Sequence, residues 1–134
     1  MTGGPMRDDA VLFRAAYRGN PVFIGHATDA ELDVIAAVVD AANARDVLHA
    51  WSLVAGRDPD GRGIQVHALG WRVALVNTWI TSALVGVGLQ PQVVSTWSGH
   101  AYRLGTEDLP EQYPELRAHL AYALRAWGFS NVGL

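Results

Sequence analysis

Five histidines are the side chains of this sequence best suited to acid–base or metal chemistry: His26, His49, His67, His100 and His119. No two of them lie three to five residues apart, the spacing that brings two imidazoles onto one metal in local zinc motifs. Cysteine is absent, which excludes disulfides, thiolate catalysis and cysteine-based metal sites. The sequence therefore predicts neither a metal site nor a cofactor site.

Two of these histidines, His67 and His100, fall in segments expected to be strands. If the two strands were neighbours, both rings could face one pocket, one as a general base and the other as the group that orients it. The competing interpretation is that both are ordinary histidines of the core or of a pocket rim. A catalytic role for His67 or His100 is therefore an alternative hypothesis, and the leading one assigns no catalytic residue.

Hydroxyl and glycine motifs add no further chemistry. Ser82 and Ser98 offer hydroxyls, but the sequence has no Gly-x-Ser-x-Gly elbow. Gly86-x-Gly88 does not extend to a dinucleotide fingerprint or a phosphate loop. Asp58-Pro59-Asp60-Gly61 is similar to the start of a calcium loop but lacks the later glutamate, so it predicts a solvated turn.

Tryptophan is abundant for this length, with five residues: Trp51, Trp71, Trp79, Trp97 and Trp127. An indole fills cores, and it is also a preferred anchor at protein interfaces. Three of the five fall in the expected sheet, where some must face outward unless helices cover both sides. The predicted binding residues are these three and two neighbours in the same stretch, namely Trp71, Trp79, Trp97, Tyr102 and Arg103.

The clearest element is a β-hairpin over residues 93–104 with its turn at Ser98-Gly99. Glycine reaches positive φ without a Cβ clash, and a two-residue primed turn needs that geometry. The predicted pairs are Trp97 with His100, Ser95 with Tyr102, and Val93 with Leu104. Side chains of paired residues share a face of the sheet. The apolar face is then predicted to hold Val93, Trp97, Tyr102 and Leu104.

The segment 71–87 has three competing interpretations. Within this segment no charged residue follows Arg72, and its length allows a transmembrane helix. Polar residues and glycines interrupt the apolar run, however. A buried soluble helix also fits, because short apolar runs are ambiguous by periodicity. The β-branched content favours two strands or one long bent strand, and we adopt this interpretation.

Helices are expected before this sheet. Residues 8–18 have a capping aspartate and an apolar stripe at helical spacing. Residues 22–24 follow as a short strand that could add an edge to the sheet. Thr28 and Glu31 have the spacing of a capping box, and apolar residues at helical spacing extend the helix they open to residue 42.

Two later segments complete the pattern. Residues 46–55 fit either a helix or a strand face, with a slight preference for helix, and residues 56–63 form a loop. The last helix is predicted to begin near Pro114, because proline suits the first helical turn, and to end at Gly128. Its apolar face would cover one side of the sheet.

Length and composition indicate one domain over residues 1–134, with residues 1–7 flexible. Half of the residues are hydrophobic and 17% are charged, which argues against disorder. The net charge of -3 argues against a nucleic-acid footprint, because phosphate binding needs clustered cations. The first residues contain no apolar signal segment, so a cytoplasmic location without a membrane partner is expected.

A resemblance bears on the hairpin. Ile80-Thr81-Ser82 and the run from Val93 to Gly105 resemble a hairpin signature of small uncharacterised bacterial and phage-associated proteins, approximately I-x-T-S followed by V-x-T-x-S-G-x-x-Y-x-L-G. This resemblance covers about a fifth of the chain. It implies a β-hairpin and a mobile-element setting, and it supplies no catalytic residue.

These observations predict an α+β fold, with an antiparallel β-meander of three to five strands over residues 64–105 between N-terminal helices and a C-terminal helix. The tryptophans and the all-arginine cations favour a non-enzymatic protein-interaction module, such as an inhibitor or accessory factor of phage or mobile-element origin. The alternative is a small cofactor-independent enzyme or ligand-binding protein with a Trp-lined pocket and His67 or His100 as general base. A homodimer is a further expectation, because a second copy could close a sheet edge.

Overall fold

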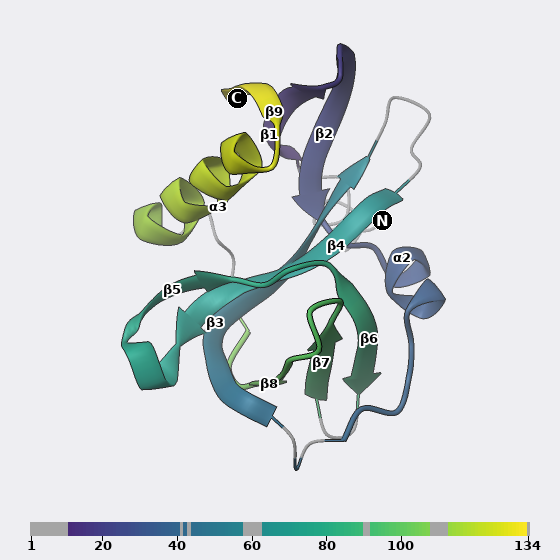
Figure 1. Ribbon diagram of the computed structural model, residues 1–134, viewed down its shortest axis with the longest axis vertical. Coiled ribbons are helices and arrows are strands. Elements are labelled where there is room, and N and C mark those ends of the chain that lie inside the picture. The colour runs from purple at the N-terminus through teal and green to yellow at the C-terminus, as the bar shows by residue number, and fades with distance from the viewer. Residues whose placement is uncertain are drawn as a thin grey trace, which may run out of the picture.

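The computed structural model describes residues 11–40, 42, 44–57, 63–89, 92–107 and 113–133. The expectations for residues 1–7 and for the calcium-like turn at 58–61 lie outside these ranges. The described residues form a sheet with two α-helices and a short 3-10 turn, η2 (Figure 1). In chain order the elements are β1 (Val11–Tyr17), β2 (Asn20–His26), α2 (Asp29–Val34), β3 (Ala44–Arg57), β4 (Gly63–Arg72), η2 (Val73–Leu75), β5 (Asn77–Ile80), β6 (Leu84–Leu89), β7 (Gln92–Thr96), β8 (Ala101–Leu104), α3 (Pro114–Ala126) and β9 (Phe129–Gly133).

The predicted meander between flanking helices is wrong, because the described residues form one mixed nine-stranded sheet. Its strands follow the order β6-β7-β8-β3-β2-β1-β9, and β4 and β5 extend from β3 outside this path. The described part of the helix predicted over residues 8–18 forms β1 instead. Residues 46–55, for which the sequence only slightly favours a helix over a strand, lie in β3. Residues 22–24 lie in β2, which is flanked by β1 and β3 and is not an edge strand.

Residues 71–87 contain the end of β4, all of β5 and the start of β6, so the preference for strands is confirmed there except at η2. These strands do not form one continuous meander, however. β4 pairs with β5, and β6, β7 and β8 pair in a second group, but β5 and β6 do not pair. The second group joins the sheet because β8 runs parallel to the first half of β3.

Strand β3 organises the sheet. β4 pairs along one edge of β3, from Leu48 opposite Arg72 to Arg57 opposite Gly63. On its other edge, β8 pairs with the first half of β3, and β2 pairs with the second half. Between the two halves the register shifts, and Ala50 has a φ of +50°. This bulge lets one strand serve two diverging parts of the sheet (Figure 1).

Helix α3 covers one face of this sheet. Pro114 stands in its first turn, and the chain leaves the helix at Trp127 and Gly128, as predicted. Leucines at four-residue spacing project from α3 toward the sheet, where they meet Ile24, Val54 and Leu69. The leucines are Leu116, Leu120 and Leu124. This cluster is the first of two hydrophobic cores.

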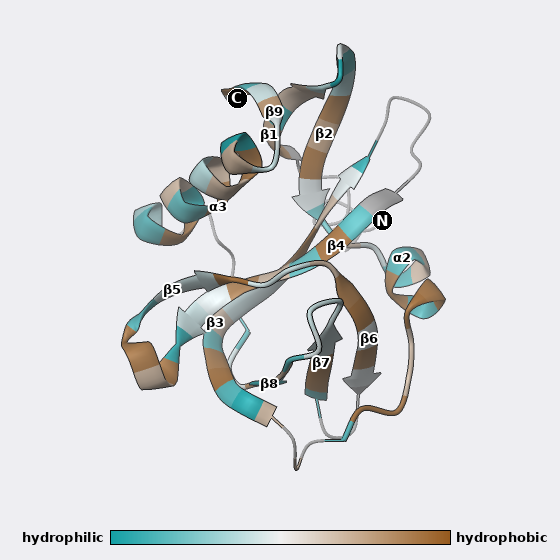
Figure 2. Ribbon diagram, viewed as in Figure 1, coloured by the Kyte–Doolittle hydropathy of each residue, from teal (hydrophilic) through white to brown (hydrophobic). Residues whose placement is uncertain are grey.

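The opposite face carries the second core. Leu53 and Ala55 of β3 point away from α3, whereas Val54 between them points toward it, as the period of two in a strand requires. Val94 and Tyr102 of β7 and β8 pack against this second face. The centre of the sheet is therefore covered on both faces, and residues 51–56 of β3 are all buried. Figure 2 shows hydrophobic residues along β2 and β6 as well.

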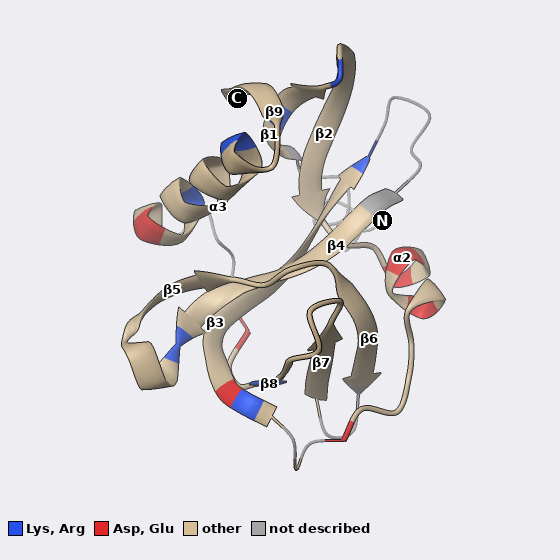
Figure 3. Cartoon of the chain, viewed as in Figure 1, with Lys and Arg blue, Asp and Glu red and all other residues tan. Residues whose placement is uncertain are grey.

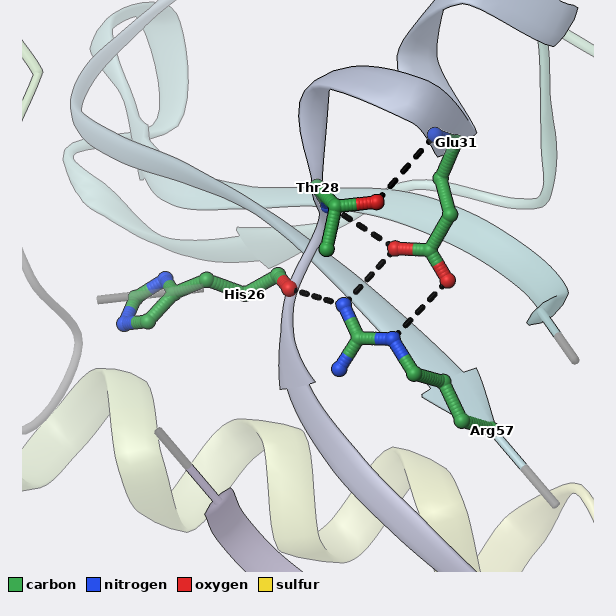
Figure 4. A network of polar contacts seen from close by, with 4 residues as sticks. All are labelled: His26, Thr28, Glu31 and Arg57. Atoms are coloured by element: carbon green, nitrogen blue, oxygen red, sulfur yellow. Dashed lines mark hydrogen bonds and ion pairs between the residues drawn. The ribbon is translucent and has the colours of Figure 1, made fainter. Parts of the chain in front are cut away.

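Helix α2 is held by a polar network of His26, Thr28, Glu31 and Arg57, which is shown in Figure 4 and called the latch below. The capping box is confirmed: the Thr28 hydroxyl accepts from the Glu31 amide at 3.2 Å, and the Thr28 amide donates to the Glu31 carboxylate at 2.8 Å. Arg57 then binds both oxygens of that carboxylate, at 2.9 and 2.7 Å, and donates to the His26 carbonyl. The latch therefore ties α2 to the ends of β2 and β3.

The helix opened by the capping box is much shorter than predicted. It has six residues, because the chain leaves it to pair with β6. The Ala37 amide donates to the Val87 carbonyl at 3.1 Å, and the Val87 amide donates to the Ile35 carbonyl at 2.9 Å. Backbone pairing with a neighbouring strand satisfies the groups that a longer helix would have used.

Replacing Thr28 with alanine is expected to lower the free energy of unfolding by about 0.5–2 kcal/mol, because the first turn of α2 loses its cap. Urea denaturation followed by tryptophan fluorescence measures this change. Ser130→Ala is the control, since its exposed hydroxyl makes only a long contact of 3.5 Å to the Ala16 carbonyl. Equal midpoints for the two variants would show that the cap contributes nothing.

The charged residues lie mainly at the ends and tips of elements, whereas the crossing of β3 and β4 carries none (Figure 3). In α3, Glu115 lies in the first turn and Arg125 in the last, which suits the helix dipole. Within the described residues, no helix has the length and hydropathy needed to cross a membrane.

Candidate functional site

The β7–β8 hairpin is shifted by one residue from the predicted register, since Val94 pairs with Tyr102. The connecting loop therefore has three residues, 97–99, instead of two. Gly99 closes it with a φ of +90°, a conformation that glycine adopts easily and that is typical of the last position of such a loop. The predicted pairs are wrong because the loop takes Trp97 out of the strand.

This register places the predicted binding residues in different environments. Trp97 lies at the hairpin tip and is 80% exposed, whereas Tyr102 is 2% exposed in the second core. The prediction that these two residues share a face is therefore wrong. Trp71 and Trp79 are half-buried, and Arg103 is exposed on β8.

Trp79 and Tyr102 surround a buried arginine. The Arg72 guanidinium lies 4.5 Å from the centre of the Trp79 ring and 5.8 Å from that of Tyr102, and its Nε donates to the Asp46 carboxylate at 2.9 Å. Burial raises the pKa of Asp46, but hydrogen bonds from the Val47 amide and Arg72 outweigh it and hold that pKa below its ordinary value. These two aromatic side chains thus stabilise a buried ion pair.

Of the two predicted histidines, His67 borders a cavity between α3 and the sheet. Its Nδ1 lies 2.9 Å from the Thr81 carbonyl oxygen. A carbonyl only accepts, so Nδ1 carries the hydrogen, and in the neutral ring Nε2 keeps a lone pair. Burial lowers the pKa of His67, and the Thr81 and Ser82 carbonyls offset only part of that effect. The ring is therefore neutral near pH 7.

The Trp127 indole stacks on the His67 ring, with ring centres 4.4 Å apart and planes inclined by 22°. The pair joins β4 to the end of α3, and it forms one wall of an inner cavity of about 120 Å³ between α3 and the sheet. The residues lining this inner cavity are Tyr17, Ile24, Val54, Ala55, Gly56, Gln65, His67, Leu120, Leu124, Trp127 and Phe129. The described lining is mostly apolar, and none of its side chains is charged near neutral pH.

An outer hollow of about 330 Å³ lies against the same pair of rings. Trp97 and Trp127, the latter 38% exposed, both border it. The complete lining is Gln65, His67, Ser82, Ala83, Trp97 and Trp127. The stacked His67 and Trp127 rings are therefore common to the inner cavity and the outer hollow.

Hydroxyl groups hold the hairpin tip in place. Ser98 Oγ lies 2.9 Å from Ser82 Oγ, 3.0 Å from Thr96 Oγ1 and 3.3 Å from His100 Nδ1. The Trp97 amide donates to a carbonyl of the segment before β6, that of Ala83, at 2.7 Å. These contacts fix the loop against the chain that enters β6.

His100 does not share a pocket with His67. It borders a third hollow of about 180 Å³, together with Arg45, Trp79 and Tyr102. The arrangement in which one histidine orients the other is therefore not formed. Across the described residues, no cluster of three or more His, Asp or Glu side chains is arranged to hold a metal ion.

No family model, curated protein or solved structure matches this chain. The geometry of its own residues is therefore what points to a function.

Sequence reasoning missed the partnership of His67 with Trp127. Trp127 is the last residue before the predicted helix end at Gly128 and His67 lies on an expected strand, and nothing in their spacing joins the two. Gly128 is the local signal for this contact. Because α3 ends before Gly128, Trp127 lies at the helix end, where its side chain can contact a neighbouring strand. Gln65, two residues before His67, lies on the same face of β4 and shares both cavities.

Proposed function

We propose that the protein is a small non-enzymatic interaction module that binds a protein partner through Trp97, Trp127 and the outer hollow between them. The observation that carries this proposal is the 80% exposure of Trp97 at the tip of a tight hairpin. Tryptophan dominates the binding energy of many interfaces, where it fills a pocket of the partner. Removing the exposed part of such a ring from water contributes roughly 3–5 kcal/mol.

The fixed loop favours binding. The hydroxyl contacts of Ser98 and the bond from the Trp97 amide to the Ala83 carbonyl restrict the loop before any partner arrives. A loop that is already ordered loses little conformational entropy on association. The outer hollow beside the tip offers room for an apolar side chain of the partner, between the two indoles.

This proposal covers the settings expected from the sequence: an inhibitor or accessory factor of phage or mobile-element origin that acts in the cytoplasm. A second copy of the chain is one form of the partner. The alternative, a ligand-binding protein or enzyme that uses His67, is supported by a different observation, the inner cavity beneath Trp127.

Trp97→Ala is expected to weaken partner binding about thirtyfold or more while leaving the unfolding free energy within about 0.5 kcal/mol of wild type. Proteins captured from the host by wild type and by the variant are compared by quantitative mass spectrometry. Each protein lost with the variant is then purified and titrated against both forms.

Tyr122→Ala is the matched control, because Tyr122 is an exposed aromatic residue on α3 that lines neither the inner cavity nor the outer hollow. Sedimentation of the purified proteins identifies a second copy as the partner if Trp97→Ala alone dissociates a dimer. Capture and association that are the same in wild type and Trp97→Ala would contradict the proposal.

A further inference from the structure

We propose that the inner cavity binds a small neutral aromatic alcohol, with the ring of the ligand between α3 and the sheet and its hydroxyl donating to His67. This inference goes beyond the partner surface described above. Trp97 does not line the inner cavity, so the two proposals can fail separately.

The size of the cavity suits a single ring. Its volume is about 120 Å³, near the roughly 150 Å³ of an apolar protein cavity that accommodates benzene. The walls are suited to such a ring, since Ile24, Val54, Leu120 and Leu124 supply aliphatic surface and Phe129 supplies an aromatic one.

The polar group of the ligand is set by His67. The hydrogen on Nδ1 is used by the Thr81 carbonyl at 2.9 Å, which leaves Nε2 as the ring nitrogen able to accept. A ligand hydroxyl is a donor that matches this acceptor. A ligand whose hydroxyl donates to this nitrogen gains a hydrogen bond that an apolar ligand of the same size lacks.

The charge of the ligand follows from the lining. Among the described residues that border the cavity, none carries an opposite charge that would compensate a buried carboxylate or ammonium group. The ligand is therefore neutral. This requirement separates a phenol from a benzoate of similar size.

The stacked rings of His67 and Trp127 lie between the inner cavity and the outer hollow, since the two rings border both spaces. Trp127 follows the last residue of α3 and is partly exposed.

Phenol is the probe for this proposal, and methyl NMR spectra of the full chain report its position. Phenol at millimolar concentration is expected to shift the methyl signals of Ile24, Val54, Leu120 and Leu124, which line the cavity. The methyl signals of Val93 and Leu104, which lie outside the cavity lining, should stay unchanged. Cavity methyl signals that do not move would overturn the proposal without the need for any variant.

Two further compounds test the chemistry. Toluene should bind roughly fivefold more weakly than phenol, because it lacks the donor. Benzoate should not bind measurably at pH 7. Equal binding of phenol and toluene, or binding of benzoate as tight as that of phenol, would overturn the assignment.

His67→Phe isolates the hydrogen bond, because a phenyl ring can still stack on Trp127 but cannot accept. We expect phenol binding to weaken roughly fivefold and toluene binding to stay within about twofold. His119→Phe is the matched control: His119 lies on α3, bonds to Thr78 at 2.9 Å and does not line the cavity. Equal loss of phenol binding in both variants, or none in either, would refute the role given to His67.

Discussion

Replacing Leu116 with alanine is expected to lower the free energy of unfolding by about 2–5 kcal/mol, the largest effect anticipated for a single residue here. Leu116 is fully buried in α3 and belongs to the core between α3 and the sheet. The variant loses the transfer free energy of the side chain and leaves a space that the surrounding strands fill only in part. Urea or thermal unfolding, followed by circular dichroism, measures the change.

Leu75→Ala is the matched control for this variant. Leu75 lies in η2 and is about half exposed, so its truncation should change stability by no more than about 0.5 kcal/mol. A Leu116→Ala variant as stable as the control would mean that α3 does not pack on the sheet as described.

Replacing Asp46 with alanine is expected to cost about 2–4 kcal/mol, because Arg72 is left as a buried cation without its partner. The value lies below that for a fully enclosed pair because Ala74, whose amide donates to the same carboxylate, is exposed. Asp46→Asn should cost less, since an amide oxygen can still accept. Asp33→Ala, at an exposed position on α2, is the control.

Lowering the pH should remove the contribution of the same ion pair to the free energy of unfolding. Burial raises the pKa of Asp46, but its hydrogen bonds and Arg72 hold that pKa below the ordinary value near 4. Its contribution is therefore complete above about pH 4 and is lost as the pH falls through the lowered pKa. The stability difference between wild type and Asp46→Ala should shrink over that range. A difference that is constant from pH 7 to pH 2 would contradict this account.

Local signals in the sequence predicted the local structures they govern. Thr28 and Glu31 form the capping box, and Pro114 and Gly128 bracket α3, because each of these features depends on residues within one helical turn. The length of the helix after Thr28 could not be predicted in this way, since it is limited by backbone pairing with Val87, far along the chain.

The two segments wrongly predicted as helices share a physical cause. A bulge in β1 between Val11 and Phe13 accompanies the burial of both Leu12 and Phe13, and the bulge near Ala50 accompanies the burial of Leu48 and Trp51. An extra residue in a strand breaks the alternation of period two. It produces spacings of one and three between buried residues, which resemble those of a helix.

The candidate site was predictable only in its parts. The sequence offered His67 only as an alternative, whereas the number of tryptophans predicted that some of them face outward, as Trp97 does. The contact of His67 with Trp127 depends on where α3 docks, and the exposure of Trp97 depends on a shift of one residue in the hairpin. Both features depend on tertiary packing and strand register, which the spacing of residues close in sequence does not predict.

The order of the strands also affects how quickly the protein can fold. One edge of β1 is paired only after β9 has formed, with Arg14 opposite Gly133. One edge of the first half of β3 is paired only after β8 has formed. Pairings between such distant segments require large loops to close first, so folding on the millisecond to second scale is typical of this kind of topology. During synthesis on the ribosome, one edge of β1 and one edge of β3 stay unpaired until the later strands emerge. Chaperones bind such exposed edges during that interval.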